Sequence, residues 1–124
     1  MTRASEAYDG NPIGELRQRL RQFAAERDWE QFHTPKNLAI ALSVEAGELL
    51  EHFQWLTPEQ EAHLSAGELE KVRLEMADVL LYLVRLADRL DVDLVAAALD
   101  KLAINTKKYP VELAKGSAKK YTEP

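Results

Sequence analysis

The fold of this chain is decided by one stretch, residues 69–90, which reads LEKVRLEMADVLLYLVRLADRL. Apolar residues recur in it at intervals of three and four, which is the spacing of one face of an α-helix. Glu75 and Asp78 stand three residues apart along one side of this face, with Tyr82 one turn further on. The stretch therefore predicts a long helix with an acidic pair beside its apolar face. That face comprises Leu69, Val72, Met76, Val79, Leu80, Leu83, Leu86 and Leu90.

A second acidic pair, Glu45 and Glu48, borders the apolar stripe of an earlier helical stretch. Like charges at this spacing repel by roughly 0.2 to 0.5 kcal/mol per pair, so two such pairs need a compensating interaction. If the two helices pack antiparallel, both pairs can share one divalent cation. Carboxylate oxygens suit Mg²⁺, with Mn²⁺ as a possible substitute, and Mg²⁺ usually meets its substrate through phosphate oxygens. The alternative is a solvated helix face, which is the ordinary place for a single acidic pair. The predicted metal ligands and catalytic residues are Glu45, Glu48, Glu75 and Asp78.

Length and composition exclude several classes of protein. The 124 residues suit one domain, and a formal charge of −5 argues against nonspecific binding to nucleic acid or to an anionic membrane. No apolar run approaches the length of a membrane span, and residues 1–12 lack the apolar core of a signal peptide. The absence of cysteine fits a reducing compartment. We therefore expect a cytoplasmic protein.

The rest of the chain predicts an all-α fold, a helical bundle with four main helices and short connectors. Thr34, Thr57, Ser65 and Asp93 are good N-caps, and Pro35 suits a first helical position. We expect a flexible segment at 1–12, one domain at 13–110 and a flexible tail at 111–124. The expected helices run from about Ile13 to Arg27, Pro35 to Gln54, Ser65 to Leu90 and Asp93 to Tyr109, with one short turn from Thr57.

The last long helix carries a polar face, with Lys101, Asn105, Lys108 and Tyr109 at i, i+4, i+7 and i+8. Cations here would offset the distal charge of a triphosphate. The alternative is that the helix dipole alone favours lysine near a C-terminus. Tryptophans elsewhere offer flat faces for a nucleobase, although such residues are more often structural anchors.

These motifs, in this order, carry a resemblance to a known family. The pattern E-x-x-E, 26 intervening residues, E-x-x-D and then N-x-x-K-Y-P resembles the all-α nucleoside triphosphate pyrophosphohydrolase superfamily, which includes MazG and the dimeric dUTPases. The run AERDWEQFHTPKNL at residues 25–38, together with Phe53-Gln54-Trp55 and the stretch from Asp78 to Tyr82, is similar to the dCTP pyrophosphatase group. The resemblance covers residues 13 to about 111.

The resemblance implies a homotetramer, a dimer of dimers, in which dimerisation completes a four-helix bundle. It also implies that the four acids bind Mg²⁺ and that Trp29 and Trp55 hold the base. Leu20 is a departure, because animal dCTP enzymes tend to carry histidine at this place. The implied substrate-binding residues are Trp29, His33, Asn37, Trp55, Tyr82, Lys101, Asn105, Lys108 and Tyr109.

The predicted activity is hydrolysis between the α and β phosphorus atoms of a deoxynucleoside triphosphate, with dCTP or a modified dCTP as the substrate. Glu45 is the candidate base, and Lys101 and Lys108 would stabilise the distal phosphates. The alternative is a protein that binds nucleotide and metal as a sensor or partner-binding subunit, without turnover.

Overall fold

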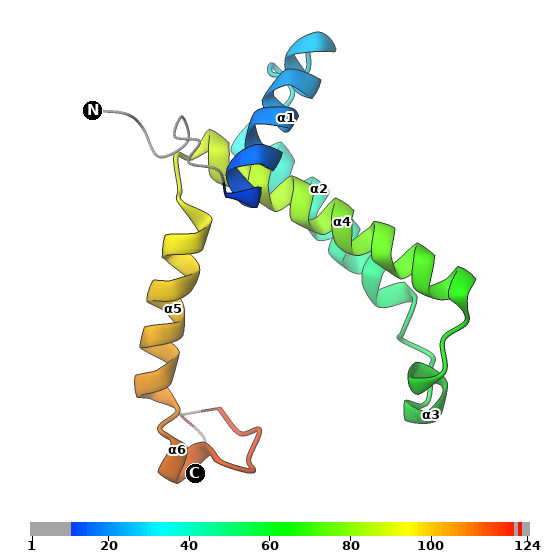
Figure 1. Cartoon of the computed structure of the whole chain (residues 1–124), viewed down its shortest axis with the longest axis vertical. Helices are drawn as coiled ribbons and strands as arrows, with labels where there is room; N and C mark the ends of the chain where they lie inside the picture. Colours follow the sequence, from blue (N-terminus) through cyan, green and yellow to red (C-terminus); the bar gives the residue numbers. More distant parts are fainter. Residues whose placement is uncertain (1–10, 121, 123–124) are drawn as a thin grey trace. The chain divides into compact units, whose positions relative to one another are not determined.

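The structure, a computed structural model, describes residues 11–120 and residue 122. Within this part of the chain there are helices and turns and no strand, which confirms the all-α fold class (Figure 1). None of its helices combines the length and the hydropathy that a membrane span requires. The helices are α1 (Pro12–Glu26), α2 (Pro35–Glu51), α3 (Pro58–Ala62), α4 (Ala66–Arg89), α5 (Leu94–Lys108) and α6 (Val111–Ala114).

Helices α1 to α5 each begin at a side-chain cap. In each case the cap accepts a hydrogen bond from the backbone N–H three residues later, at 2.6 to 3.2 Å. Gln60 Oε1 also accepts from the Thr57 backbone N–H at 2.9 Å, which completes the predicted capping box. Four of these caps confirm predictions, and Asn11 is a fifth that the sequence prediction missed. The caps are Asn11, Thr34, Thr57, Ser65 and Asp93.

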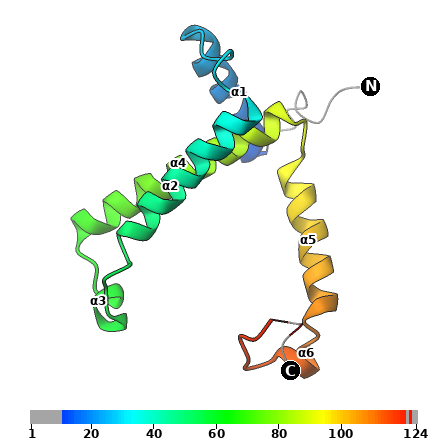
Figure 2. The same cartoon turned by 180° about the vertical axis from the view of Figure 1, so that it is seen from behind.

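Helices α2 and α4 form an antiparallel hairpin. They lie side by side in both views, joined through α3, and α1 packs against α4 (Figures 1 and 2). The antiparallel course places the second half of α2 opposite the first half of α4, which is the condition under which the two acidic pairs can converge. The buried apolar side chains of the described residues lie on these helices, and they are Ala24, Leu38, Val72, Val84 and Ala87.

The apolar stripe predicted on α4 is mostly exposed among the described residues of one chain. Val72 is only 6% exposed, but Leu69 and Met76 are 56% and 57% exposed. Helices α1 and α2 both contact α4, but they leave the side chains of Leu69 and Met76 exposed. Apolar surface of this extent is typical of a contact surface.

Two compact units divide the chain, one up to Val92 and one from Asp93 on, and each is described by itself. In the second unit α5 ends before Tyr109, as predicted from Pro110. The short helix α6 then occupies the start of the predicted tail, because the Pro110 carbonyl accepts from the N–H groups of Leu113 and Ala114 at 3.0 and 2.9 Å. Residues 1–10, 121 and 123–124 of the predicted flexible ends lie outside the described residues. The domain boundaries stay predictions.

Candidate functional site

Three of the four predicted acids meet between α2 and α4. Glu45, Glu48 and Glu75 each offer a carboxylate oxygen, and these oxygens lie within 4.8 Å of one another. We call these three residues the acid cluster. It forms because the packing of α2 against α4 sets the Glu45–Glu48 turn of α2 against the Glu75 turn of α4. Asp78 lies outside this group, but its charge contributes to the raised pKa of Glu45.

The acid cluster holds less negative charge than three separate carboxylates would. The pKa of Glu75 is raised to about 8, mainly by the hydrogen bond between Glu75 and Glu48, and then by burial and by Glu45. Burial and then Glu48 raise the pKa of Glu45, against a smaller opposing effect of its hydrogen bond with Glu75. Closely spaced carboxylates share protons near neutral pH unless a cation is present. The acid cluster is therefore poised to exchange protons for a metal ion.

One atom of the acid cluster makes the fit to a cation specific. Glu45 Oε2 is buried and has no hydrogen-bond partner within the described residues. A buried carboxylate oxygen without a partner is costly, and a bound cation would satisfy it. Because every donor in the cluster is a carboxylate oxygen, the site fits Mg²⁺ or Mn²⁺ better than a softer metal.

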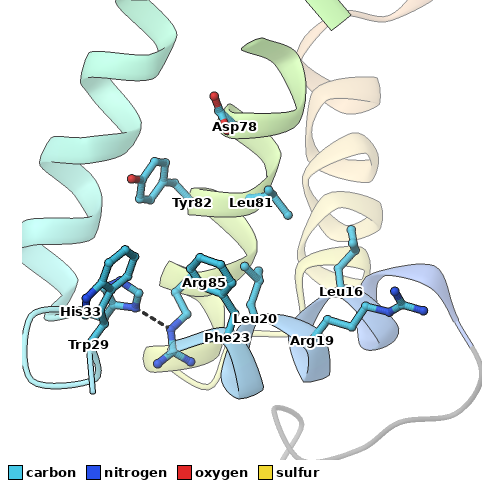
Figure 3. Close-up of a pocket in the computed structure, with 10 residues that line it drawn as sticks. All are labelled: Leu16, Arg19, Leu20, Phe23, Trp29, His33, Asp78, Leu81, Tyr82 and Arg85. Atoms are coloured by element: carbon cyan, nitrogen blue, oxygen red, sulfur yellow. Dashed lines mark hydrogen bonds between the residues drawn. The ribbon is translucent and has the colours of Figure 1, made fainter. Parts of the chain in front are cut away.

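A pocket lies between α1, the α1–α2 connector and α4. Its volume is about 440 Å³, within the range of small-molecule sites. Leu16, Leu20 and Phe23 of α1 and Leu81 of α4 supply apolar walls. Asp78 also lines the pocket, one turn of α4 beyond Tyr82 (Figure 3). Asp78 thus connects the pocket with the acid cluster.

Three of the predicted substrate-binding residues line this pocket: Trp29, His33 and Tyr82. Asp28 adopts a left-handed conformation with φ 53°, and the Trp29 N–H donates to the Ala24 carbonyl at 2.9 Å. This turn closes α1 and folds the connector back over it. The Trp29 ring meets Phe23 edge-on, with ring centroids 5.6 Å apart, and it lies 6.2 Å from the His33 ring.

A polar network around the buried Arg85, which lines the pocket together with His33, was missed by the sequence prediction. Arg85 Nε donates to His33 Nδ1 at 3.1 Å, and Arg85 Nη1 donates to Asp88 Oδ2 at 3.3 Å. Burial, followed by the charges of Arg85 and Arg89, lowers the pKa of His33, and Glu30 partly opposes this. A signal for Arg85 was present in the sequence, because it shares a helix face with Asp78 and Tyr82 at i, i+4 and i+7.

Two other predicted substrate-binding residues of the first unit lie outside the pocket. Trp55 follows the end of α2 and is 85% exposed, whereas Trp29 precedes the start of α2. The 17 residues of α2 span about 25 Å, so one chain cannot bring both tryptophans to one base. Asn37 is engaged locally, since its Nδ2 donates to the Phe32 carbonyl at 3.0 Å. The substrate roles of Trp55 and Asn37 stay predictions.

The remaining predicted residues belong to the second unit, which is described by itself. Lys101 is exposed, and Asn105 and Lys108 are partly buried along the same helix. Tyr109 caps the end of α5, where its N–H donates to the Asn105 carbonyl at 2.9 Å. Their contact with a substrate stays a prediction.

The chain is similar to known proteins along most of its length. The family model described as the MazG-like family matches residues 40–123. dCTP pyrophosphatase 1 of Homo sapiens is 50% identical over 113 residues, which are 90% of this chain and 66% of that protein. The Bos taurus protein of the same name is 49% identical over 113 residues, which are 90% of this chain and 67% of that protein. This chain thus spans 66% of the length of its human relative.

A solved structure supports the same relation. The crystal structure of a pyrophosphatase from Archaeoglobus fulgidus matches with a TM-score of 0.72 and 38% sequence identity. The match covers 84% of this chain and 97% of that one. The resemblance inferred from the motifs is therefore confirmed.

Proposed function

Because the chain belongs to the MazG-like family, we propose that it is a metal-dependent nucleoside triphosphate pyrophosphohydrolase acting on dCTP or a modified dCTP. The observation that carries the proposal is the acid cluster beside an apolar and aromatic pocket, with Asp78 bordering both. Such a site can take phosphates at one end and a base at the other. The names of the mammalian relatives and of the archaeal pyrophosphatase support this substrate class.

The proposed cofactor is Mg²⁺, with Mn²⁺ as a substitute, held by Glu45, Glu48, Glu75 and Asp78. When bound, such a cation neutralises charge on the phosphate oxygens and on the leaving pyrophosphate. The raised pKa values of Glu45 and Glu75 and the unpaired Glu45 Oε2 support this assignment.

Glu45 is the proposed general base. Its carboxylate can accept a proton from water, and its raised pKa brings it closer to the operating pH, where general bases work best. As the water oxygen bonds to phosphorus, the bridging P–O bond between the α and β phosphorus atoms breaks. The products are a nucleoside monophosphate and pyrophosphate.

The pocket would hold the nucleoside. Trp29 offers a stacking face, and Tyr82, on the same helix face as Asp78, suits contact with the sugar, where its ring would disfavour a ribose 2′-hydroxyl. Lys101 and Lys108 are the proposed partners of the distal phosphates. Leu20 lines the pocket, so its departure from the histidine of animal relatives bears on base preference.

We further propose that the chain works as a tetramer, a dimer of dimers. The exposed stripe on α4 supports this, since a second copy would cover it. Self-association also allows Trp55 of one chain to serve the pocket of another, which one chain alone cannot achieve.

The test is release of pyrophosphate from a panel of nucleotides with Mg²⁺ or Mn²⁺. We expect turnover of dCTP or 5-modified dCTP, and loss of turnover in Glu48→Gln. The matched control is Glu51→Gln, a change on the same helix outside the acid cluster, which should retain wild-type rates. Binding of nucleotide and metal without turnover would contradict the enzyme and favour a sensor.

A further inference from the structure

We propose that Arg85, held by Asp88, which Arg21 fixes in turn, is a positioning residue that sets His33 as the neutral tautomer with its proton on Nε2. The pocket then presents a hydrogen-bond donor at this position, and the matching group of the ligand is an acceptor. Naming that ligand as a nucleotide rests on the proposed function, whereas the state of His33 does not.

The first step concerns Arg85. Its side chain is 5% exposed, and Asp88, also buried, accepts from Arg85 and from Arg21. The Arg21 guanidinium binds Asp88 through two bonds, Nε to Oδ2 at 2.8 Å and Nη2 to Oδ1 at 2.6 Å. Two guanidinium groups thus share one carboxylate. The two bonds from Arg21 fix the Asp88 carboxylate. The single bond from Arg85 Nη1 to this carboxylate, together with the burial of Arg85, keeps its Nε directed at His33.

The second step concerns the proton on His33. An arginine side chain is always a donor, so His33 Nδ1 must accept from Arg85 Nε with its lone pair. In a neutral imidazole the proton then lies on Nε2. Any hydrogen bond from His33 to a ligand therefore passes through Nε2–H.

The third step concerns the neutral state. Arg21, Arg85 and Asp88 together carry one net positive charge, and Arg89 adds another nearby. A protonated His33 would lose its acceptor at Nδ1 and add a further cation. Glu30, on the connector, is the acid that favours protonation. The positive charges near His33 thus outweigh the negative charge of Glu30, in agreement with the lowered pKa of His33. The ring is therefore neutral at pH 7.

Nitrogen NMR of the ¹⁵N-labelled full chain, without metal or nucleotide, tests the state of His33 directly. The chain has three histidines, and the signal lost in His33→Gln identifies this ring. We expect the Nε2–H tautomer of His33 at pH 7.5 and a titration midpoint of this ring below pH 6.5. In Arg85→Met we expect a mixture of tautomers and a higher midpoint. Arg73→Met, which removes an exposed arginine of the same helix, is the matched control and should change neither.

Arg85→Met leaves the bidentate Arg21–Asp88 pair in place, and circular dichroism checks its fold. Arg85→Leu is a second variant, which also lacks any hydrogen-bond donor, and it should release the tautomer as well. The wild-type spectrum alone can overturn the proposal, if His33 carries its proton on Nδ1 or titrates at or above 6.5. An unchanged tautomer in a folded Arg85 variant would overturn it as well.

A double-mutant cycle with dCTP tests the consequence for binding. We expect Arg85→Met to raise KM about twofold to tenfold, the size of one neutral hydrogen bond, with kcat nearly unchanged. In a His33→Ala background the same change should raise KM no further. Fully additive effects would mean that Arg85 does not act through His33. Absence of wild-type turnover would contradict the proposed function instead, and the NMR result would still decide the role of Arg85.

Discussion

Metal binding to the acid cluster should release a proton, and Glu75 is its source. With a pKa of about 8 in the metal-free protein, Glu75 is protonated at pH 7 to a fraction of about 0.9, and at pH 9 to a fraction of about 0.1. Because a carboxylate must be ionised to bind metal, about 0.9 proton should leave per ion at pH 7. The apparent affinity for Mg²⁺ or Mn²⁺ should then rise almost tenfold per pH unit up to about pH 8.

Isothermal titration of Mn²⁺ in two buffers with different ionisation enthalpies measures this release. Glu75→Gln should abolish it, whereas Glu70→Gln should not, because Arg73 lowers the pKa of Glu70 and keeps it ionised. A release near zero at pH 7, with affinity independent of pH between 6 and 8, would refute the shared proton. Equal release in wild type and Glu75→Gln would assign the proton to another group.

The same pKa has a consequence for folding without metal. The pKa of Glu75 is raised from 4.5 in the unfolded chain, so this group stabilises the fold below pH 4.5, and that stabilisation is lost as pH rises through about 8. Bound metal should reverse this loss of stability with rising pH. At a metal concentration a hundredfold above the dissociation constant, the free energy of unfolding should rise by about 2.7 kcal/mol. Thermal unfolding with and without Mg²⁺, from pH 5 to 9, measures both effects.

Three further predictions concern the remaining residues and the assembly. Asp78→Asn should abolish pyrophosphate release with unchanged circular dichroism, and a near-normal rate would remove Asp78 from the site. Light scattering should give a tetramer of the 14.0 kDa chain, and a compact monomer at micromolar concentration would contradict it. Trp29→Ala should raise KM for dCTP about tenfold to a hundredfold, the value of one stacked base, and Trp55→Ala should do so only if the chains associate. Equal quenching of tryptophan fluorescence by non-hydrolysable dCTP and dGTP analogues would argue against pyrimidine selection.

Local sequence determined where the helices begin and end. A cap such as Thr34 acts on a backbone N–H three residues away, and Pro110 restricts the residue directly before it, so both effects are contained in short segments. The spacing of Glu45, Glu48, Glu75 and Asp78 also needs only helical periodicity to place each pair on one face. The motifs therefore sufficed for the all-α class and for the family.

Contacts between distant segments were decided only by the tertiary structure. Arg85 meets His33 across 52 positions of sequence, and neither residue type nor helical spacing specifies such a pair. The packing of α2 on α4 likewise selects Glu45, Glu48 and Glu75 as neighbours. Periodicity identifies which face of a helix is apolar, but the neighbours available in three dimensions decide whether that face is buried. Leu69 and Met76 stay exposed among the described residues.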